Sequence, residues 1–198
     1  RTSFIFSGRR TYIDLLAKPF IKRASEGNNS GGYFFYDFNA KLNHKFSEKD
    51  RLYLSAYSGK DRFYVGEKYT YEDYNSEMDM GLNWGNITSA LRWNHLFSNK
   101  LFANTTLTYS RYFFDTNMED KSQMLDDFEE IRFRYYSGIE DYGAKIDFDY
   151  LPNPNHHIRF GTNYTDHTFY PGSMELYQRQ NNTISQDTSF NFSETQHA

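Results

Sequence analysis

Apolar and polar side chains alternate along residues 32–46 of this chain. One set of alternate positions holds Phe34, Tyr36, Phe38, Ala40, Leu42, His44 and Phe46, and the other holds Tyr33, Phe35, Asp37, Asn39, Lys41, Asn43 and Lys45. A period of two is typical of a β-strand with two different faces. A strand of this length would reach about 50 Å, whereas strands of soluble sheets usually hold only about 5–6 residues. The pattern therefore predicts an unusually long strand.

Similar alternation recurs along the rest of the chain. We expect strands within residues 1–13, 32–46, 52–59, 80–97, 101–110, 141–150 and 158–165, and an eighth that begins near Thr183 with a weaker pattern. In residues 80–97, Leu82 and Trp84 fall on the opposite parity to Ile87 and Leu91. A β-bulge near residues 85–86 would return them to the same face.

Short turns and long polar segments alternate between these strands. The short turns are residues 47–50, 98–100 and 152–155, and the expected long loops cover roughly 14–31, 61–78, 114–128 and 166–185. Short turns at one end and long loops at the other are typical of transmembrane β-barrels, in which the short turns face the periplasm. The rhythm predicts an all-β, antiparallel, up-and-down transmembrane β-barrel, with its long loops outside the cell.

The composition agrees with strands that cross a membrane. Tyr, Phe and Trp make up 20% of the chain, which favours strands, and some of them close the apolar rows near the short turns as an aromatic girdle would. These ring residues are Phe46, Trp93, Phe97, Phe148 and Tyr150. No apolar run is long enough for a spanning helix, and the net charge of -4 argues against a nucleic-acid partner. The alternative interpretation is the buried aromatic core of a soluble β-sandwich.

The strand count points to part of a larger barrel. The face opposite the apolar rows carries small residues, such as Gly143 and Gly161, together with charges such as Asp37, Lys41 and Arg159. A small closed barrel must fill its interior with packed and paired side chains, whereas a wide barrel encloses a channel or a plug. We therefore expect a seven- to eight-strand portion of a wide barrel, an open arc with unpaired edges.

Three stretches of the sequence resemble TonB-dependent outer-membrane receptors of Bacteroidetes. Residues 7–14 read Ser-Gly-Arg-Arg-Thr-Tyr-Ile-Asp, similar to an early barrel strand of that family, and residues 36–42 and 157–164 look like later strands. The resemblance spans most of residues 1–170. It implies a 22-stranded barrel that imports a scarce nutrient, with energy passed from the TonB-ExbB-ExbD complex to a plug domain.

On this interpretation, residues 1–198 are a partial outer-membrane β-barrel domain whose plug is not present in this chain. The implied location is the outer membrane, and the implied partners are outer-membrane lipid, the TonB-ExbB-ExbD complex acting through the plug, and a surface lipoprotein. The nutrient stays open among siderophores, haem, cobalamin, peptides and glycans. Two other functions stay open as well: a passive outer-membrane channel or adhesin, and a soluble β-sandwich that binds glycans.

Candidate site residues are aromatic rather than catalytic. We find no arrangement typical of an enzyme, a cofactor or a metal, because His156 and His157 would point to opposite faces and the acidic segments lack the spacing of an EF-hand loop. Exposed aromatic rings stack on sugars and flat ligands, and they also anchor interfaces. We therefore predict ligand contacts from Phe63, Tyr64, Tyr69, Tyr71, Tyr74, Tyr135 and Tyr136. The alternative for these residues is packing of the loops upon themselves.

Overall fold

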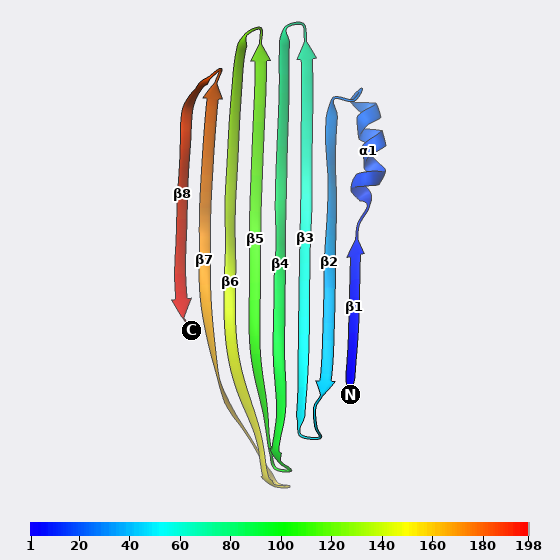
Figure 1. Ribbon diagram of the computed structural model, residues 1–198, viewed down its shortest axis with the longest axis vertical. Coiled ribbons are helices and arrows are strands. Elements are labelled where there is room, and N and C mark those ends of the chain that lie inside the picture. The colour runs from blue at the N-terminus through cyan, green and yellow to red at the C-terminus, as the bar shows by residue number, and fades with distance from the viewer. Residues whose placement is uncertain (198) are drawn as a thin grey trace.

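The computed structural model describes residues 1–197 as one antiparallel sheet with a single helix at its edge (Figure 1). The elements are β1 (Thr2–Arg10), α1 (Ile13–Ala24), β2 (Asn29–Lys45), β3 (Asp50–Tyr71), β4 (Tyr74–Ser98), β5 (Leu101–Met124), β6 (Asp127–Asn153), β7 (His156–Gln180) and β8 (Thr183–His197). Every strand pairs with its neighbour in sequence, so the sheet runs from β1 to β8 in chain order. The all-β, up-and-down prediction is confirmed, including the eighth strand, and the sheet is open.

The three predicted short turns are confirmed. They separate β2 from β3, β4 from β5, and β6 from β7, and all three lie at one end of the sheet (Figure 1). In the first of these turns, the Ser47 hydroxyl accepts hydrogen bonds from the backbone amides of Lys49 at 3.1 Å and Asp50 at 3.0 Å. A serine that binds nearby backbone amides in this way stabilises a tight turn.

The prediction of four long loops is wrong. Residues 61–78, 114–128 and 166–185 continue the strands and reverse direction in two-residue turns, formed by 72–73, 125–126 and 181–182. The segment 14–31 holds α1 and the start of β2. Most of the charged residues in these segments, such as Lys68, Glu77 and Glu119, lie on one face of the extended strands, where water can solvate them as well as it would in a loop.

The predicted bulge near residues 85–86 is also wrong. Pairing runs without interruption through Lys60–Gly85 and Gly59–Asn86, and then from Gly85 to Phe113 on the next strand. Leu82 and Trp84 therefore stay on the face opposite Ile87, because successive side chains in a regular strand alternate. The apolar residues of β4 change parity because the apolar face of the sheet changes along the strand. No extra residue is inserted.

Helix α1 takes the place that β1 leaves empty beside β2. The pairing of β1 with β2 ends at Arg10 and Tyr36, and α1 lies beside the remainder of β2 (Figure 1). Asp14 in its first turn is buried and binds Arg10 at 2.9 Å. The helix covers an edge that would otherwise offer unpaired backbone groups to another strand. Within residues 1–197, no helix is long and apolar enough to span a membrane.

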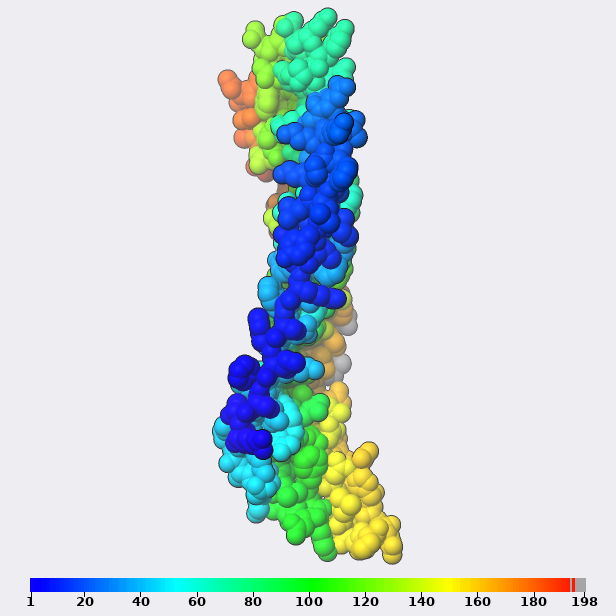
Figure 2. All heavy atoms as spheres, turned by 90° about the vertical axis from the view of Figure 1, so that its right-hand side faces the viewer, coloured from blue at the N-terminus to red at the C-terminus, as the bar shows by residue number. Residues whose placement is uncertain are grey.

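The sheet forms a single layer without a hydrophobic core. Seen edge-on, the molecule is thin and twisted along its length (Figure 2). Among the residues whose burial is described, Ala103 is the one buried hydrophobic side chain, while many large apolar side chains are exposed. Domains normally bury such surface between two packed layers. The apolar parts of both faces therefore need to be covered by something other than the described residues.

Candidate functional site

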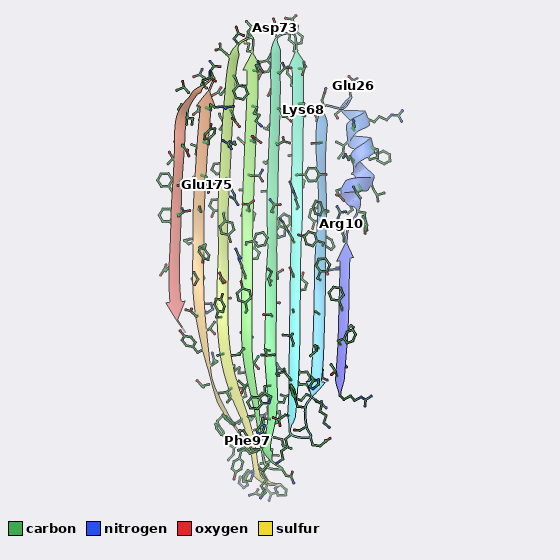
Figure 3. The ribbon with its side chains drawn as sticks, in the orientation of Figure 1. Arg10, Glu26, Lys68, Asp73, Phe97 and Glu175 are labelled. Atoms are coloured by element: carbon green, nitrogen blue, oxygen red, sulfur yellow. The ribbon has the colours of Figure 1, made fainter. Side chains whose placement is uncertain are left out.

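The two faces of the sheet are named after two neighbouring residues of β3, whose side chains point to opposite sides. We call them the Leu54 face and the Tyr53 face. Residues that pair directly across antiparallel strands share a face, so the register assigns every strand residue to one face or the other. The half of the sheet near the short turns, where Phe97 lies, is called the lower half; Lys68, Asp73 and Glu175 lie in the upper half (Figure 3).

In the lower half, the Leu54 face is apolar. This lower apolar band comprises Phe4, Phe6, Phe38, Leu42, Leu52, Leu54, Ile87, Leu91, Trp93, Leu107, Ala144, Ile146, Phe148, Ile158 and Phe160. Aromatic rings border it on both sides: Phe148 stacks on Phe97 and Phe160 near the short turns, and Tyr109 lies 5.1 Å from Tyr142 at the upper edge. A band edged by two aromatic rows is the arrangement found on the lipid-facing side of membrane barrels.

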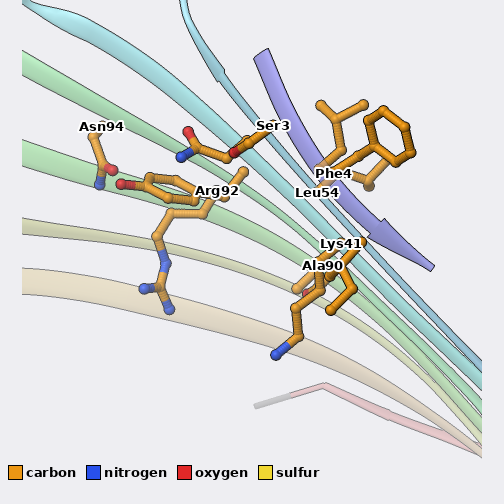
Figure 4. Close-up of a pocket in the computed structure, with 12 residues that line it drawn as sticks. Ser3, Phe4, Lys41, Leu54, Ala90, Arg92 and Asn94 are labelled. Carbon is orange, nitrogen blue, oxygen red and sulfur yellow. The ribbon is translucent and has the colours of Figure 1, made fainter. Parts of the chain in front are cut away.

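The Tyr53 face of the lower half is polar. A hollow of about 650 Å³ lies over β1 to β4 on this side, and Lys41, Arg92 and Asn94 extend into it while Phe4 points away (Figure 4). A second hollow, of about 600 Å³, continues over β4 to β7. Polar side chains on this face and apolar ones on the other match the lumen and lipid sides of a barrel strand.

In the upper half the polarity of the two faces is exchanged. The Tyr53 face now carries an upper apolar band, made of Tyr33, Phe35, Phe63, Val65, Met80, Leu82, Trp84, Phe114, Met118, Phe133, Tyr135, Met174, Leu176 and Phe190. Tyr33 stacks on Trp84 with ring centroids 6.2 Å apart, and Phe114 meets Tyr135 at 6.4 Å. This band crosses β2 to β8 and is the largest aromatic surface of the upper half.

The Leu54 face of the upper half is a network of ion pairs. Arg134 binds Asp115 at 2.9 Å, and Glu130 accepts from Arg179 at 3.0 Å. The Lys121 ammonium, 2.8 Å away, lowers the pKa of Glu119 by its hydrogen bond and its charge. Surface pairs of this kind add little stability each, but they keep this face solvated and polar.

The border between the apolar and the charged part of the Leu54 face runs diagonally across the strands. Lys60 in β3 is in register with Phe113, and Arg111 in β5 lies two residues lower than Phe113. Asp166 in β7 is in register with Tyr109, two residues lower than Arg111. The first charge above the band therefore descends by four residues from β3 through β5 to β7. On β4 the first charge of this face is Asp79, which pairs with Gly66, six residues above Lys60.

The short turns descend in the same direction. Asp50, at the start of β3, is in register with Ala103 and Phe148. The β4–β5 hairpin closes at Leu101, two residues beyond Ala103, and the β6–β7 hairpin closes at Asn153, five residues beyond Phe148. Because both borders shift together, the lower apolar band keeps a nearly constant width along β3, β5 and β7.

The structure divides the predicted ligand contacts between the two faces. Phe63, Tyr69, Tyr71, Tyr74 and Tyr135 share the Tyr53 face, whereas Tyr64 and Tyr136 lie on the Leu54 face. Neighbouring positions in a strand point oppositely, so no ligand on one face can contact all seven.

The seven predicted residues also differ in the contacts that they form within the sheet. The rings of Tyr69 and Tyr74 lie 6.2 Å apart near a hairpin tip. The Tyr135 hydroxyl donates to the Pro171 carbonyl at 2.9 Å, and the Tyr136 hydroxyl accepts from Arg111 at 3.3 Å. Tyr135 lies within the upper apolar band, so it has its ring, rather than its hydroxyl, available to a ligand.

Sequence reasoning missed most of the upper apolar band. The missed residues include Tyr33, Phe35, Leu82, Trp84, Phe114, Met118 and Phe133. Alternation continues through the segments interpreted as loops, but with apolar residues on the opposite parity, and that reversal is the signal that could have identified them.

The upper apolar band can contact an apolar or aromatic ligand. It offers aromatic and apolar side chains, with Asp61 between Phe35 and Trp84. Within the described part of the chain, no three His, Asp or Glu side chains gather as a metal site would require. His156 and His157 are occupied separately, by Asn153 at 2.8 Å and Asp149 at 2.6 Å.

Comparison with known proteins gives only distant likenesses. No protein-family model matches the chain, and no curated protein matches it. Among solved structures, the outer-membrane channel DcaP of Acinetobacter baumannii is 8% identical with a TM-score of 0.16, over 85% of this chain and 64% of that one. The KdgM porin in complex with disordered oligogalacturonate is 11% identical with a TM-score of 0.13, over 96% of both chains. These scores are too low to carry an argument, and the chain spans less than two thirds of the DcaP channel.

Proposed function

We propose that these strands form part of the wall of a TonB-dependent outer-membrane transporter, which binds a scarce nutrient outside the cell and imports it. The observation that carries the proposal is the exchange of apolar faces along the strands. A band on one face that is apolar over a nearly constant width suits contact with lipid. The long upper half, charged on that same face, suits exposure to water above the membrane.

The width of the lower apolar band supports a membrane-spanning role. On the Leu54 face, the charge-free stretch covers residues 51–59 of β3 and 101–110 of β5. A tilted transmembrane strand needs about 9–11 residues to cross the hydrocarbon core. The five strands from β3 to β7 are 22 to 27 residues long, so about half of each would stand outside the membrane.

The diagonal borders support a barrel. A descent of four residues between β3 and β7 is one residue per strand. With about 3.3 Å per residue and about 4.8 Å between strands, this stagger tilts the strands by about 35° from the normal of the band. Strands of outer-membrane barrels are tilted by about 35–45°. A soluble sheet has no reason to hold both borders parallel in this way.

The transporter hypothesis assigns the two faces to different environments. The lower Tyr53 face, with Lys41 and Arg92, would line the interior and contact a plug. The upper apolar band would line the outer vestibule, where it would meet the nutrient or a surface lipoprotein. The 22-stranded size, the plug and the TonB-ExbB-ExbD complex rest on the sequence resemblance of residues 7–14, 36–42 and 157–164.

The test follows uptake in cells that carry the natural full-length protein. Fluorescent or isotopic siderophore, haem, cobalamin, peptide and glycan are supplied to cells with and without the gene, and again after a protonophore collapses the proton gradient. We expect uptake of one class that needs both the gene and the gradient. Uptake that survives the protonophore would identify a passive channel instead, and recovery of the protein in the soluble fraction would favour the glycan-binding sandwich.

A further inference from the structure

We infer that a hollow on the Leu54 face, at the upper border of the lower apolar band, binds the phosphate group of a membrane lipid. The inference rests on the proposed membrane orientation. The hollow has a volume of about 300 Å³ and is lined by Lys60, Arg111, Arg134 and Asp115, with Ile87 and Phe113 beside them. Its size is at the lower end of the range for small-molecule sites.

The charge of the hollow is positive and incompletely compensated. Asp115 is the one carboxylate that lines it, and it already accepts from Arg134 at 2.9 Å and from Asn83 at 3.2 Å. Arg111 donates to the neutral Tyr136 hydroxyl at 3.3 Å. Among the side chains that the structure describes, that of Lys60 has no hydrogen-bond, ion-pair or ring partner.

A neighbouring acid offsets part of this charge without forming an ion pair with it. Glu140 pairs across the strands with Arg111, but no ion pair joins them, and its carboxylate accepts from the hydroxyls of Tyr109 at 3.1 Å and Tyr142 at 2.9 Å. Arg62, the next cation along the Leu54 face of β3, lies over the Tyr64 ring at 5.9 Å. Lys60 and the N–H groups of Arg111 that Tyr136 does not use can therefore bind a further anion.

The position of the hollow selects a lipid over a soluble anion. Ile87 and Phe113 connect it to the lower apolar band, where Leu91 and Leu107 continue toward the short turns. A lipid whose phosphate group is bound by Lys60 and Arg111 would place its acyl chains along that band. Charge-assisted hydrogen bonds from the cations and burial of the chains would then act on one molecule.

The chain offers a matched control on the opposite face. Lys41 and Arg92 line the polar hollow of the Tyr53 face, and neither forms an ion pair within the described residues. Replacing them with glutamine removes one lysine and one arginine, as does the pair Lys60→Gln and Arg111→Gln. The two double variants therefore have the same net charge and differ only in the face that loses it.

The experiment measures lipid binding to the full-length protein purified in a nonionic detergent. Phosphatidic acid, diacylglycerol with the same acyl chains and inorganic phosphate are each titrated, and binding is quantified by native mass spectrometry. We expect phosphatidic acid to bind more tightly than diacylglycerol and inorganic phosphate. The Lys60→Gln/Arg111→Gln variant should lose roughly tenfold or more in phosphatidic acid affinity, whereas Lys41→Gln/Arg92→Gln should stay within about twofold.

Several results would overturn the inference. These are equal binding of phosphatidic acid and diacylglycerol, equally tight binding of inorganic phosphate, and equal losses in the two double variants. The charge-conserving Lys60→Arg variant should retain binding, which separates loss of the site from misfolding. Membrane fractionation of the wild type separates failure of this inference from failure of the proposed membrane function. A protein that is found in the membrane but does not prefer phosphatidic acid contradicts only the lipid site.

Discussion

Tyr33 of β2 and Trp84 of β4 stack across β3 on the Tyr53 face, with ring centroids 6.2 Å apart and planes inclined by 20°. The strand between them contributes Asp61, whose carboxylate accepts a hydrogen bond from the Tyr33 hydroxyl. Nine residues further along β4, Trp93 lies on the opposite face, within the lower apolar band. The two tryptophans of the chain thus mark the two apolar bands.

The Tyr33–Trp84 stack should contribute measurably to the upper half. We expect a double-mutant cycle of Tyr33→Leu and Trp84→Leu to give a coupling energy of about 0.5–1.5 kcal/mol, which is usual for aromatic pairs. The measurement is urea unfolding of the full-length protein folded in lipid bilayers. Tyr33→Phe serves as the control, because it removes the bond to Asp61 while keeping the ring; additive effects of the two leucine substitutions would contradict the prediction.

An arginine placed in the lower half of the sheet should strongly destabilise the protein only where it lies on the Leu54 face. Leu91→Arg is expected to cost about 2–4 kcal/mol in bilayers, because arginine is costly on the lipid side of a barrel strand. Its neighbour Ala90 faces the polar hollow, so Ala90→Arg should cost less than about 1 kcal/mol. Equal costs in urea unfolding would mean that the two faces meet the same environment.

The turn at residues 125–126 should be improvable. Leu125 has a φ of 57°, in a region that costs energy for an ordinary side chain, whereas the corresponding residue of the next upper turn is Asn181, with a φ of 52°. Leu125→Asn should therefore stabilise the protein by about 1 kcal/mol, measured as a higher urea midpoint.

The reverse exchange provides the comparison. Asn181 also accepts a hydrogen bond from the Phe128 amide at 2.6 Å, so Asn181→Leu should destabilise by more than Leu125→Asn stabilises. A lower midpoint for Leu125→Asn would show that Leu125 has apolar contacts in the assembled protein that outweigh its backbone strain.

The first short turn should contribute stability that depends on pH. Hydrogen bonds from His95, Ser47 and Trp93 lower the pKa of Asp50. A carboxylate whose pKa is depressed in the folded state stabilises it above the unfolded pKa of about 3.9, and this contribution is lost as the pH falls through the lower, folded pKa. The stability difference between wild type and Asp50→Asn should be present above the unfolded pKa of Asp50 and should disappear in strong acid. A difference that persists in strong acid would refute the assignment.

The lower half of the sheet could be predicted from the sequence, and the upper half could not. Residues 36–46 keep an apolar row on one parity, so the faces of this part of β2 could be predicted. In β4, the apolar residues change from the parity of Ile87 to that of Trp84. Such a change can arise from a β-bulge, or from a regular strand whose apolar side chains move from one face of the sheet to the other. The sequence of one strand does not distinguish the two, because register with β3 and β5 decides between them.

Most of the upper apolar band was missed in the sequence for the same reason. Charged residues such as Asp115, Glu119 and Lys121 raise the polarity of residues 114–128 enough to suggest a loop, although these three share one face of β5. The ring residues on the other face, such as Phe114, become a continuous surface only when seven strands are aligned. The composition of a single segment cannot reveal a band that is assembled across a sheet.

The most direct test of the exchange of faces uses the two tryptophans in lipid bilayers. Lipids with brominated acyl chains quench tryptophans that face the hydrocarbon core, so the quenched emission of the full-length wild type is compared with that of Trp84→Phe and Trp93→Phe. We predict that Trp93→Phe removes a quenchable component and that Trp84→Phe removes a component that the brominated lipids do not quench. Equal quenching of the two tryptophans, or quenching of Trp84 alone, would contradict the account.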